Sequence, residues 1–214
     1  MSGPRWSYKL HVALHPIDQT DVDGSFVLYY AATAAADTAA HCVGAAISTN
    51  IRGPYTPIEA TIACPISQGG AIDPAGHHHP DGSLYVVYKV DGNSIGHGGS
   101  CNNGVAPIVL TPIMLQEVAA NGYTLIGAAV QILDRSAADG PLGEVPSLIY
   151  VDGVFFCSLA PGATRMRRTC RLHHCSSRPN TGSLRRGVRD RCQGWSKIVF
   201  HAYLGATISS GRGF

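Results

Sequence analysis

Three stretches of the chain share one pattern, an Asp-Gly pair followed by alternating aromatic and aliphatic residues. They are DGSFVLYY at 23–30, DGSLYVVY at 81–88 and the shorter VDGVFF at 151–156. Asp-Gly is a preferred tight-turn pair, and β-branched and aromatic residues favour strands. The pattern therefore predicts three strands that each follow a turn, and its recurrence indicates repeated antiparallel units.

Other stretches extend this prediction to the rest of the first 156 residues. Strands are expected at 42–48, 112–118 and 127–133, with Asn121-Gly122 as the hairpin turn between the last two. The alanine-rich stretch 31–40 is expected to be a loop, because its apolar residues lack helical spacing. The whole pattern favours an all-β fold, either a β-propeller or a sandwich of hairpins. The propeller is preferred because its blades bury repeated faces against one another.

The composition suits a single loop-rich β domain. The chain has 214 residues, 45% of them hydrophobic, with 25 Gly and 13 Pro. No stretch is long and apolar enough to span a membrane. The start, MSGPRWSYKLHVALHP, lacks the apolar segment of a secretory signal. Taken literally, the chain is cytoplasmic or a piece of something longer.

Charge is distributed unevenly along the chain. Residues 1–160 hold 5 Lys and Arg against 13 Asp and Glu, whereas residues 161–214 hold 11 Lys and Arg against one acid. Four of the seven cysteines also lie at position 157 or later. We therefore divide the chain into a poorly patterned lead at 1–18, a β domain at 19–156 and a basic Arg/Cys-rich tail at 157–214.

Two carboxylates stand in similar sequence surroundings. Asp73 follows two glycines and precedes Pro74, and Glu144 follows Gly143 and precedes Pro146 by two positions. In a propeller, matching positions of different blades converge at one end of the central axis, so the two acids would meet there. Paired carboxylates are what glycoside hydrolysis requires. The alternatives are that Asp73 only caps a turn, or that both are unrelated surface acids.

At these residues the chain resembles glycoside hydrolase family 43. The resemblance covers residues 19–156 and is carried by SQGGAIDP (67–74), LYVVYKVDGNSIGHGG (84–99) and DGPLGEVPSL (139–148). It implies a five-bladed β-propeller, of which this chain would hold about the first three blades. It also implies an inverting hydrolase of arabinose- or xylose-containing polysaccharides that needs no cofactor. Members of the family are usually secreted.

The resemblance also assigns roles to three acids. It implies that Glu144 is the general acid and that Asp73 orients this acid and modulates its pKa. The family's general base is an Asp directly after a proline. Here Ile17 separates Pro16 from Asp18, and Leu14-His15 replaces the usual upstream tryptophan. Asp18 is the candidate base, but a shift of one residue in a strand turns its side chain to the other face. Without the base, hydrolysis should largely fail.

Several other side chains are candidates for smaller roles. His97, between two glycines, is a candidate sugar contact, and Lys89 either binds substrate or pairs with an acid. Cys42 and Cys64 would form a disulfide if the parent protein is secreted. The three histidines at 77–79 lie in a predicted turn and are expected to be solvated rather than to bind a metal.

The tail departs from the family pattern after Phe156. Its lack of alternating apolar residues suggests translation out of frame or from a retained intron from about residue 157. The Cys and His residues of CRLHHC at 170–175, with Cys192 and His201, offer a weak zinc set, and the Arg clusters at 165–171 and 185–191 offer a nucleic-acid contact. A basic tail without function is preferred to both.

Three functions thus follow from the sequence. The first is a glycoside hydrolase whose partner is a pentose-containing polysaccharide or oligosaccharide. The second is a catalytically inactive fragment of such an enzyme, and the third is a nucleic-acid-binding basic tail protein. No membrane partner is expected, and the sequence does not predict an oligomeric state.

Overall fold

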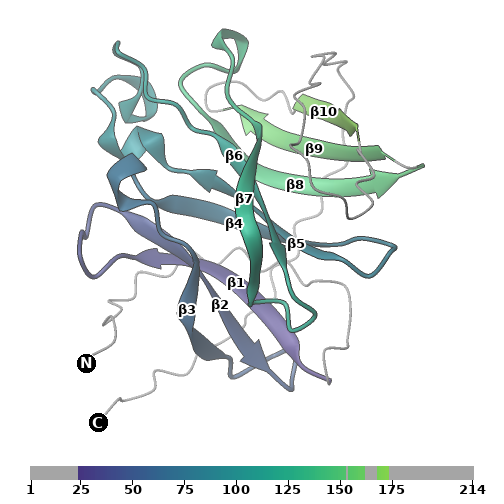
Figure 1. The fold of residues 1–214 in the computed structure, drawn as a ribbon. Coiled ribbons are helices and arrows are strands. Elements are labelled where there is room, and N and C mark those ends of the chain that lie inside the picture. Colours follow the sequence, from purple (N-terminus) through teal and green to yellow (C-terminus); the bar gives the residue numbers. More distant parts are fainter. Residues whose placement is uncertain (1–23, 153, 162–167, 174–214) are drawn as a thin grey trace.

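The computed structural model describes residues 24–152, 154–161 and 168–173, and all statements about structure refer to these residues (Figure 1). They form ten strands and four short 3₁₀ helices. The strands are β1 (Phe26–Thr33), β2 (His41–Ser48), β3 (Thr56–Ala63), β4 (Ala71–His78), β5 (Leu84–Val90), β6 (Ile113–Val118), β7 (Leu125–Leu133), β8 (Gly143–Val151), β9 (Val154–Pro161) and β10 (Arg168–His173). The 3₁₀ helices are η1 (Ile66–Gln68), η2 (Gly92–Ile95), η3 (Ser100–Asn102) and η4 (Ala137–Asp139).

The strands form three antiparallel sheets, each of which follows chain order. The orders are β1-β2-β3, β4-β5-β6-β7 and β8-β9-β10. The all-β prediction is confirmed. Residues 31–40 are not helical, as expected, but the prediction of a loop is wrong for 31–33, because β1 continues to Thr33. The sequence pattern predicted no strand at β3 or β4.

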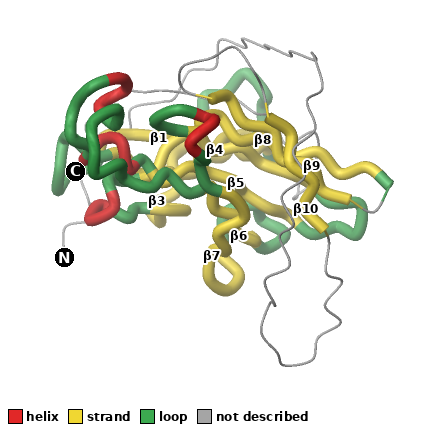
Figure 2. Tube along the Cα trace, turned by 90° about the horizontal axis from the view of Figure 1, so that it is seen from above, coloured by secondary structure: helices red, strands yellow, loops and turns green. Residues whose placement is uncertain are grey.

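The sheets pack side by side through their first strands, since β1 contacts β4 and β4 contacts β8 (Figure 1). Buried residues of the first two sheets form one apolar cluster, which includes Tyr29, Val43 and Val86. A second cluster joins the second and third sheets and includes Val87 and Leu148. Seen from above, most of the helical segments and their loops lie towards the left of the view, and a further helical segment lies beside β4 (Figure 2).

A double-glycine turn leads into β4. Gly69 and Gly70 have φ values of 97° and 91°, which side chains rarely adopt. A Cβ on Gly69 would lie 2.3 Å from the carbonyl oxygen of Asp91, and one on Gly70 would lie 2.4 Å from that of His41. Only glycines therefore let the chain pass between the end of β5 and the start of β2.

A disulfide joins Cys42 of β2 to Cys64, just after β3, as predicted for a secreted parent. It lies next to the turn described above, because His41 forms an isolated bridge with Gly70. The disulfide closes this end of the first sheet, and the bridge holds the same end against the start of β4.

The third sheet extends into the predicted basic tail. β9 spans the proposed domain boundary after Phe156, and β10 pairs with it from Arg168 to His173. The hypothesis of an altered reading frame from about residue 157 concerns the transcript and stays a prediction. Within the described ranges, none of the helices has the length and apolar character required to cross a membrane.

Candidate active site

β4 and β8 contain the same irregularity at the same place. In β4, Ile72 pairs with Lys89 and Ala75 pairs with Val87, so β4 holds one residue more than its partner β5 between these pairs. In β8 the extra residue lies between Glu144, opposite Ala160, and Ser147, opposite Ser158. Such a β-bulge bends the strand and redirects its side chains, and bulges often occur next to active sites.

Backbone conformation confirms that the two bulges are equivalent. Asp73 and Val145 both have left-handed φ values, 54° and 51°. Each is followed by a fully buried proline, Pro74 or Pro146. A proline fits there because it has no N–H to donate to the strand ladder, and a bulge is one of the few sheet positions that tolerate it.

This equivalence corrects one detail of the sequence interpretation. Aligning the bulges matches Asp73 with Val145 and Ile72 with Glu144, so the two acids are offset by one position. The two acids are nonetheless close enough for the charge of Glu144 to act on Asp73. Asp73 Oδ2 accepts a hydrogen bond of 2.9 Å from the backbone N–H of Val145, the residue directly after Glu144.

Asp73 is held in a partly buried environment. Burial raises the pKa of its carboxyl above the ordinary value, and the negative charges of Glu144 and Asp91 act in the same direction. The hydrogen bond from Val145 and the positive charge of Lys89 oppose this rise without cancelling it.

Lys89, on β5, joins Glu144 to a second group of polar side chains. Its side chain is 0% exposed, whereas that of Glu144 is 39% exposed. Lys89 Nζ donates hydrogen bonds to Glu144 Oε1 at 3.2 Å and to Asn93 Oδ1 at 2.7 Å. It also lies 3.2 Å from Asp91 Oδ1. Of the two roles expected for Lys89, the structure shows the ion pair with an acid.

The other candidates lie elsewhere or outside the described ranges. Asp18 lies outside them, as do the side chains of the weak zinc set in the tail. His97 is exposed in the loop after η2 and takes no part in the contacts around Lys89. Among described residues, no group of three or more His, Cys, Asp or Glu side chains could hold a metal ion.

Sequence reasoning missed Asp91 and Asn93. The available signal is their spacing, since Lys89, Asp91 and Asn93 alternate along the end of β5 and the start of η2. Alternation in an extended segment accounts for Lys89 and Asp91 only. Asn93 lies within η2, and the turn of that helix, rather than strand alternation, brings its side chain to Lys89. It also missed the backbone N–H of Val145, which no side-chain pattern reveals.

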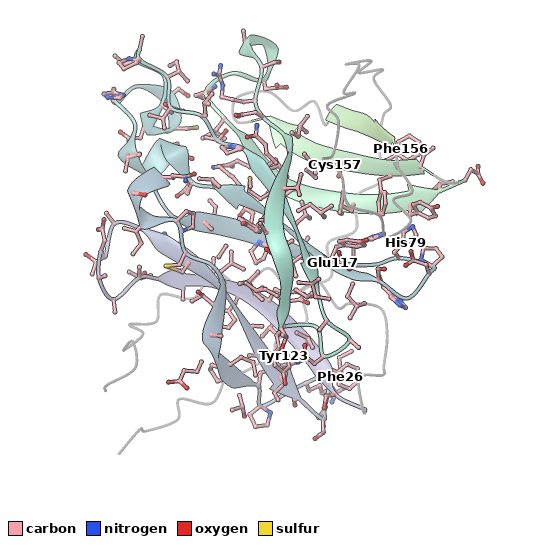
Figure 3. All side chains as sticks on the ribbon, in the orientation of Figure 1. Phe26, His79, Glu117, Tyr123, Phe156 and Cys157 are labelled. Carbon is pink, nitrogen blue, oxygen red and sulfur yellow. A yellow bond between two sulfur atoms is a disulfide. The ribbon has the colours of Figure 1, made fainter. Side chains whose placement is uncertain are left out.

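The histidines at 77–79 are not uniformly solvated, which corrects the expectation for them. His79 is buried and His77 partly buried, while His78 is exposed. The ring of His79 stacks on Phe155 at 5.2 Å and meets Tyr150 edge-on at 4.2 Å, measured between ring centroids. Figure 3 shows His79 on the β4–β5 hairpin, beside the third sheet.

A family model places the chain among known proteins. The model described as glycosyl hydrolases family 43 matches residues 15–185, most of the chain. The chain belongs to glycosyl hydrolase family 43. The match extends beyond the boundary after Phe156 and so includes β9 and β10 of this family 43 chain. No curated protein matches it.

Solved structures show the same fold. A thermostable family-43 glycoside hydrolase matches with a TM-score of 0.57 and 18% identity, over 72% of this chain and 49% of the other. The GH43_1 enzyme from Xanthomonas citri complexed with xylotriose matches with a TM-score of 0.56 and 16% identity, over 73% and 50%. CoXyl43, a β-xylosidase/α-arabinofuranosidase from a compost microbial metagenome, matches with a TM-score of 0.52 and 17% identity, over 74% and 52%. This family 43 chain therefore spans about half the length of these relatives.

Proposed function

We propose that this chain carries two catalytic carboxylates of an inverting glycosidase that hydrolyses bonds to arabinose or xylose. Glu144 is the general acid that protonates the leaving oxygen, and Asp73 orients it and modulates its pKa. The hydrogen bond from Val145 N–H to Asp73 Oδ2 is the observation that carries the proposal, because it holds Asp73 beside the strand position of Glu144. Asp18 remains the proposed base that activates water on the opposite face of the sugar.

The substrate class follows from the family and the relatives. CoXyl43 is named for activity on both xylosides and arabinofuranosides, and it was solved with xylotriose. We assign a pentose-containing oligosaccharide or polysaccharide to this chain on that similarity. Secretion of the parent protein is part of the same proposal, and the Cys42–Cys64 disulfide supports it.

The finer fold assignment is also a proposal. The three sheets would be blades of a five-bladed propeller, with β1, β4 and β8 as the innermost strands. Contacts of β4 with both β1 and β8 support this order, and so do the equivalent bulges in β4 and β8, the first strands of their sheets. The remaining blades would belong to the half of the relatives that this chain does not match.

The first prediction concerns Glu144. Glu144→Gln should lower the rate of pentose release from xylotriose or an arabino-oligosaccharide by about 10²–10⁴-fold, because the leaving sugar oxygen loses its proton donor. The loss should be much smaller on 4-nitrophenyl pentosides, whose leaving group departs without protonation. Both rates are measured on the full chain, with proton NMR showing whether the first product has the inverted anomeric configuration.

Glu117→Gln is the matched control. Glu117 pairs with Tyr85 near the end of the second sheet away from Lys89, so its replacement should leave both rates unchanged. Glu144→Gln activity on xylotriose within tenfold of the parent, or a retained configuration, would contradict the assignment.

A second candidate function is a sugar-binding remnant without hydrolytic activity. The observation that favours it is the coverage of about half of each solved relative. It is supported if the full chain binds xylotriose in isothermal titration calorimetry but releases no pentose.

A further inference from the structure

Lys89 is a buried positive charge beside the two carboxylates. Removing an ammonium group from water is costly unless it is paired and hydrogen-bonded. Three oxygens surround Lys89 Nζ, from Asn93, Glu144 and Asp91. Two of these belong to its own β5–η2 segment, and only Glu144 belongs to another sheet. Asn93 and Asp91 therefore hold the ammonium group of Lys89 in a position from which it donates a hydrogen bond to Glu144.

We propose that Lys89 is a positioning residue that selects which oxygen of Glu144 carries the catalytic proton, an inference that rests on the proposed function. An ammonium group only donates hydrogen bonds. Glu144 Oε1, which faces Lys89 Nζ, must therefore remain an acceptor when the carboxyl is protonated. The proton is then confined to Oε2, the oxygen that would face the leaving group.

Asp91 makes this arrangement compatible with an acid catalyst. A lone positive charge beside Glu144 would favour its ionised form, which cannot donate a proton. The charged groups near Glu144 in the described residues are Lys89 from β5, Asp91 directly after β5 and Asp73 from β4. Asp91 offsets the positive charge of Lys89, and Asp73 adds further negative charge on the side of β4. Removal of Lys89 and removal of the Asp91 charge should thus act on Glu144 in opposite directions.

Enzyme kinetics on the full chain test the catalytic consequence. Lys89→Met should lower kcat on xylotriose by about 10–100-fold, the cost of a misplaced catalytic group, with KM changed by less than about twofold. The alkaline limb of the pH–rate profile should move to higher pH in Lys89→Met and to lower pH in Asp91→Asn. Lys89→Arg, which keeps the charge, should recover most of the lost kcat. A purely structural Lys89 would move the melting temperature without these opposite pH shifts.

Carbon NMR tests the same coupling without any need for activity. The chain contains only three glutamates, Glu59, Glu117 and Glu144, so a sample labelled with ¹³C at the glutamate carboxyls gives three resolvable titrations. Glu144→Gln assigns the relevant signal. The titration midpoint of Glu144 should rise in Lys89→Met and fall in Asp91→Asn. Unchanged midpoints, or shifts in one direction for both, would overturn the proposal.

The double variant Lys89→Met/Asp91→Asn covers the case in which Lys89→Met fails to fold. It removes both charges of the buried pair, a change that proteins often tolerate. It should retain a nearly parental pH profile and still show the reduced kcat, and parental kcat would overturn the proposal. Failure of the proposed function is recognised separately, because pentose release would then survive Glu144→Gln. In that case the NMR titration still decides whether Lys89 affects the protonation of Glu144.

Discussion

Asp73 combines a partly buried carboxyl group with a left-handed backbone conformation. Both features carry a free-energy cost, because burial disfavours the ionised form and non-glycine residues seldom adopt a positive φ. Costs of this kind persist where the surrounding structure holds the residue for a function. Asp73 thus has the properties expected of a residue retained for its chemistry rather than for stability.

The prediction for this residue is that Asp73→Asn stabilises the protein near pH 7. The raised pKa means that the folded state binds the proton of Asp73 more tightly than the unfolded state does. The stabilising contribution is present below the ordinary Asp value and is lost as the pH rises through the folded-state pKa. Asn keeps the acceptor oxygen for Val145, tolerates positive φ and carries no charge.

Thermal unfolding at a series of pH values measures this effect. The melting temperature of Asp73→Asn should exceed that of the parent at pH 7, and the difference should shrink towards pH 4. Glu59→Gln, on an exposed part of β3, should show no such pattern. A variant that is less stable than the parent at pH 7 would contradict the interpretation of Asp73.

Some site residues can be recognised from the sequence, and others cannot. Asp73 and Glu144 could be found because each precedes a proline within two positions, a pattern that the bulge imposes. The offset of one residue between them could not be predicted, since it depends on the strand register. The pairing of Lys89 with Glu144 bridges two sheets, and no local pattern specifies a contact over 55 positions.

At the scale of elements, the β4–β5 hairpin is the part of the second sheet that packs on β8 and β9 through aromatic rings. His77 contacts Phe155, with ring centroids 5.3 Å apart, and its Nε2 is buried without a hydrogen-bond partner. Burial lowers the pKa of His77, and the nearby His79 acts in the same direction. Protonation of His77 should therefore weaken the packing of the two sheets.

The prediction for this hairpin is that acid destabilises the protein through His77. A lowered folded-state pKa gives a contribution that is complete above the unfolded value of about 6.5 and is lost as the pH falls below it. His77→Phe, which keeps a ring against Phe155, should reduce the drop in melting temperature between pH 7 and pH 5. His78→Phe is the control because His78 is exposed, and an equal change in both variants would refute the role of His77.

Strand prediction succeeded where one pattern was strong and failed where two signals conflicted. β1 and β5 are rich in aromatic and branched residues, so their strand character is plain. β3 is partly exposed and contains Pro57, and β4 contains Pro74 and Gly76, residues that indicate turns. Bulges and edge positions let strands accept such residues, and neither feature can be recognised from one sequence.

The whole molecule has an apolar sheet face that the described residues leave uncovered. Ile149 and Val151 of β8 are 56% and 48% exposed, whereas the adjacent Leu148 is buried against the second sheet. Figure 3 shows Phe156, the partner of Ile149 on β9, at the same outer sheet. The chain spans about half the length of its solved relatives, and in the proposed propeller the next blade would cover this face. Exposed apolar faces of this kind favour association.

The prediction at this scale is that Ile149→Lys/Val151→Lys increases the soluble fraction of the full chain. Lysine at exposed strand positions opposes association, and the loss of apolar contacts should be small because both side chains are exposed. The soluble fraction after centrifugation and light scattering measure the effect, and the melting temperature should change little. Leu148→Lys, one position away on the buried side, should instead unfold the protein, and equal behaviour of both variants would contradict the assignment of faces.

The origin of the tail is a separate question at this scale. Sequencing the transcript across the codons around residue 157 tests the altered reading frame, and an uninterrupted native frame would refute it. The family match extends through residue 185, but it compares protein sequences and does not replace a sequence of the transcript.

The Cys42–Cys64 link has a practical consequence for producing this protein. A cross-link closing a loop of this size contributes about 2–4 kcal/mol. Here it lies beside His41, which bridges Gly70 in the turn that leads to Asp73. Recombinant material from the cytosol of an ordinary bacterial host, where thiols stay reduced, should thus melt at a lower temperature than material exported to the periplasm. Cys42→Ser/Cys64→Ser should abolish that dependence on the expression host, and identical melting curves for both preparations of the parent would show that the link contributes nothing.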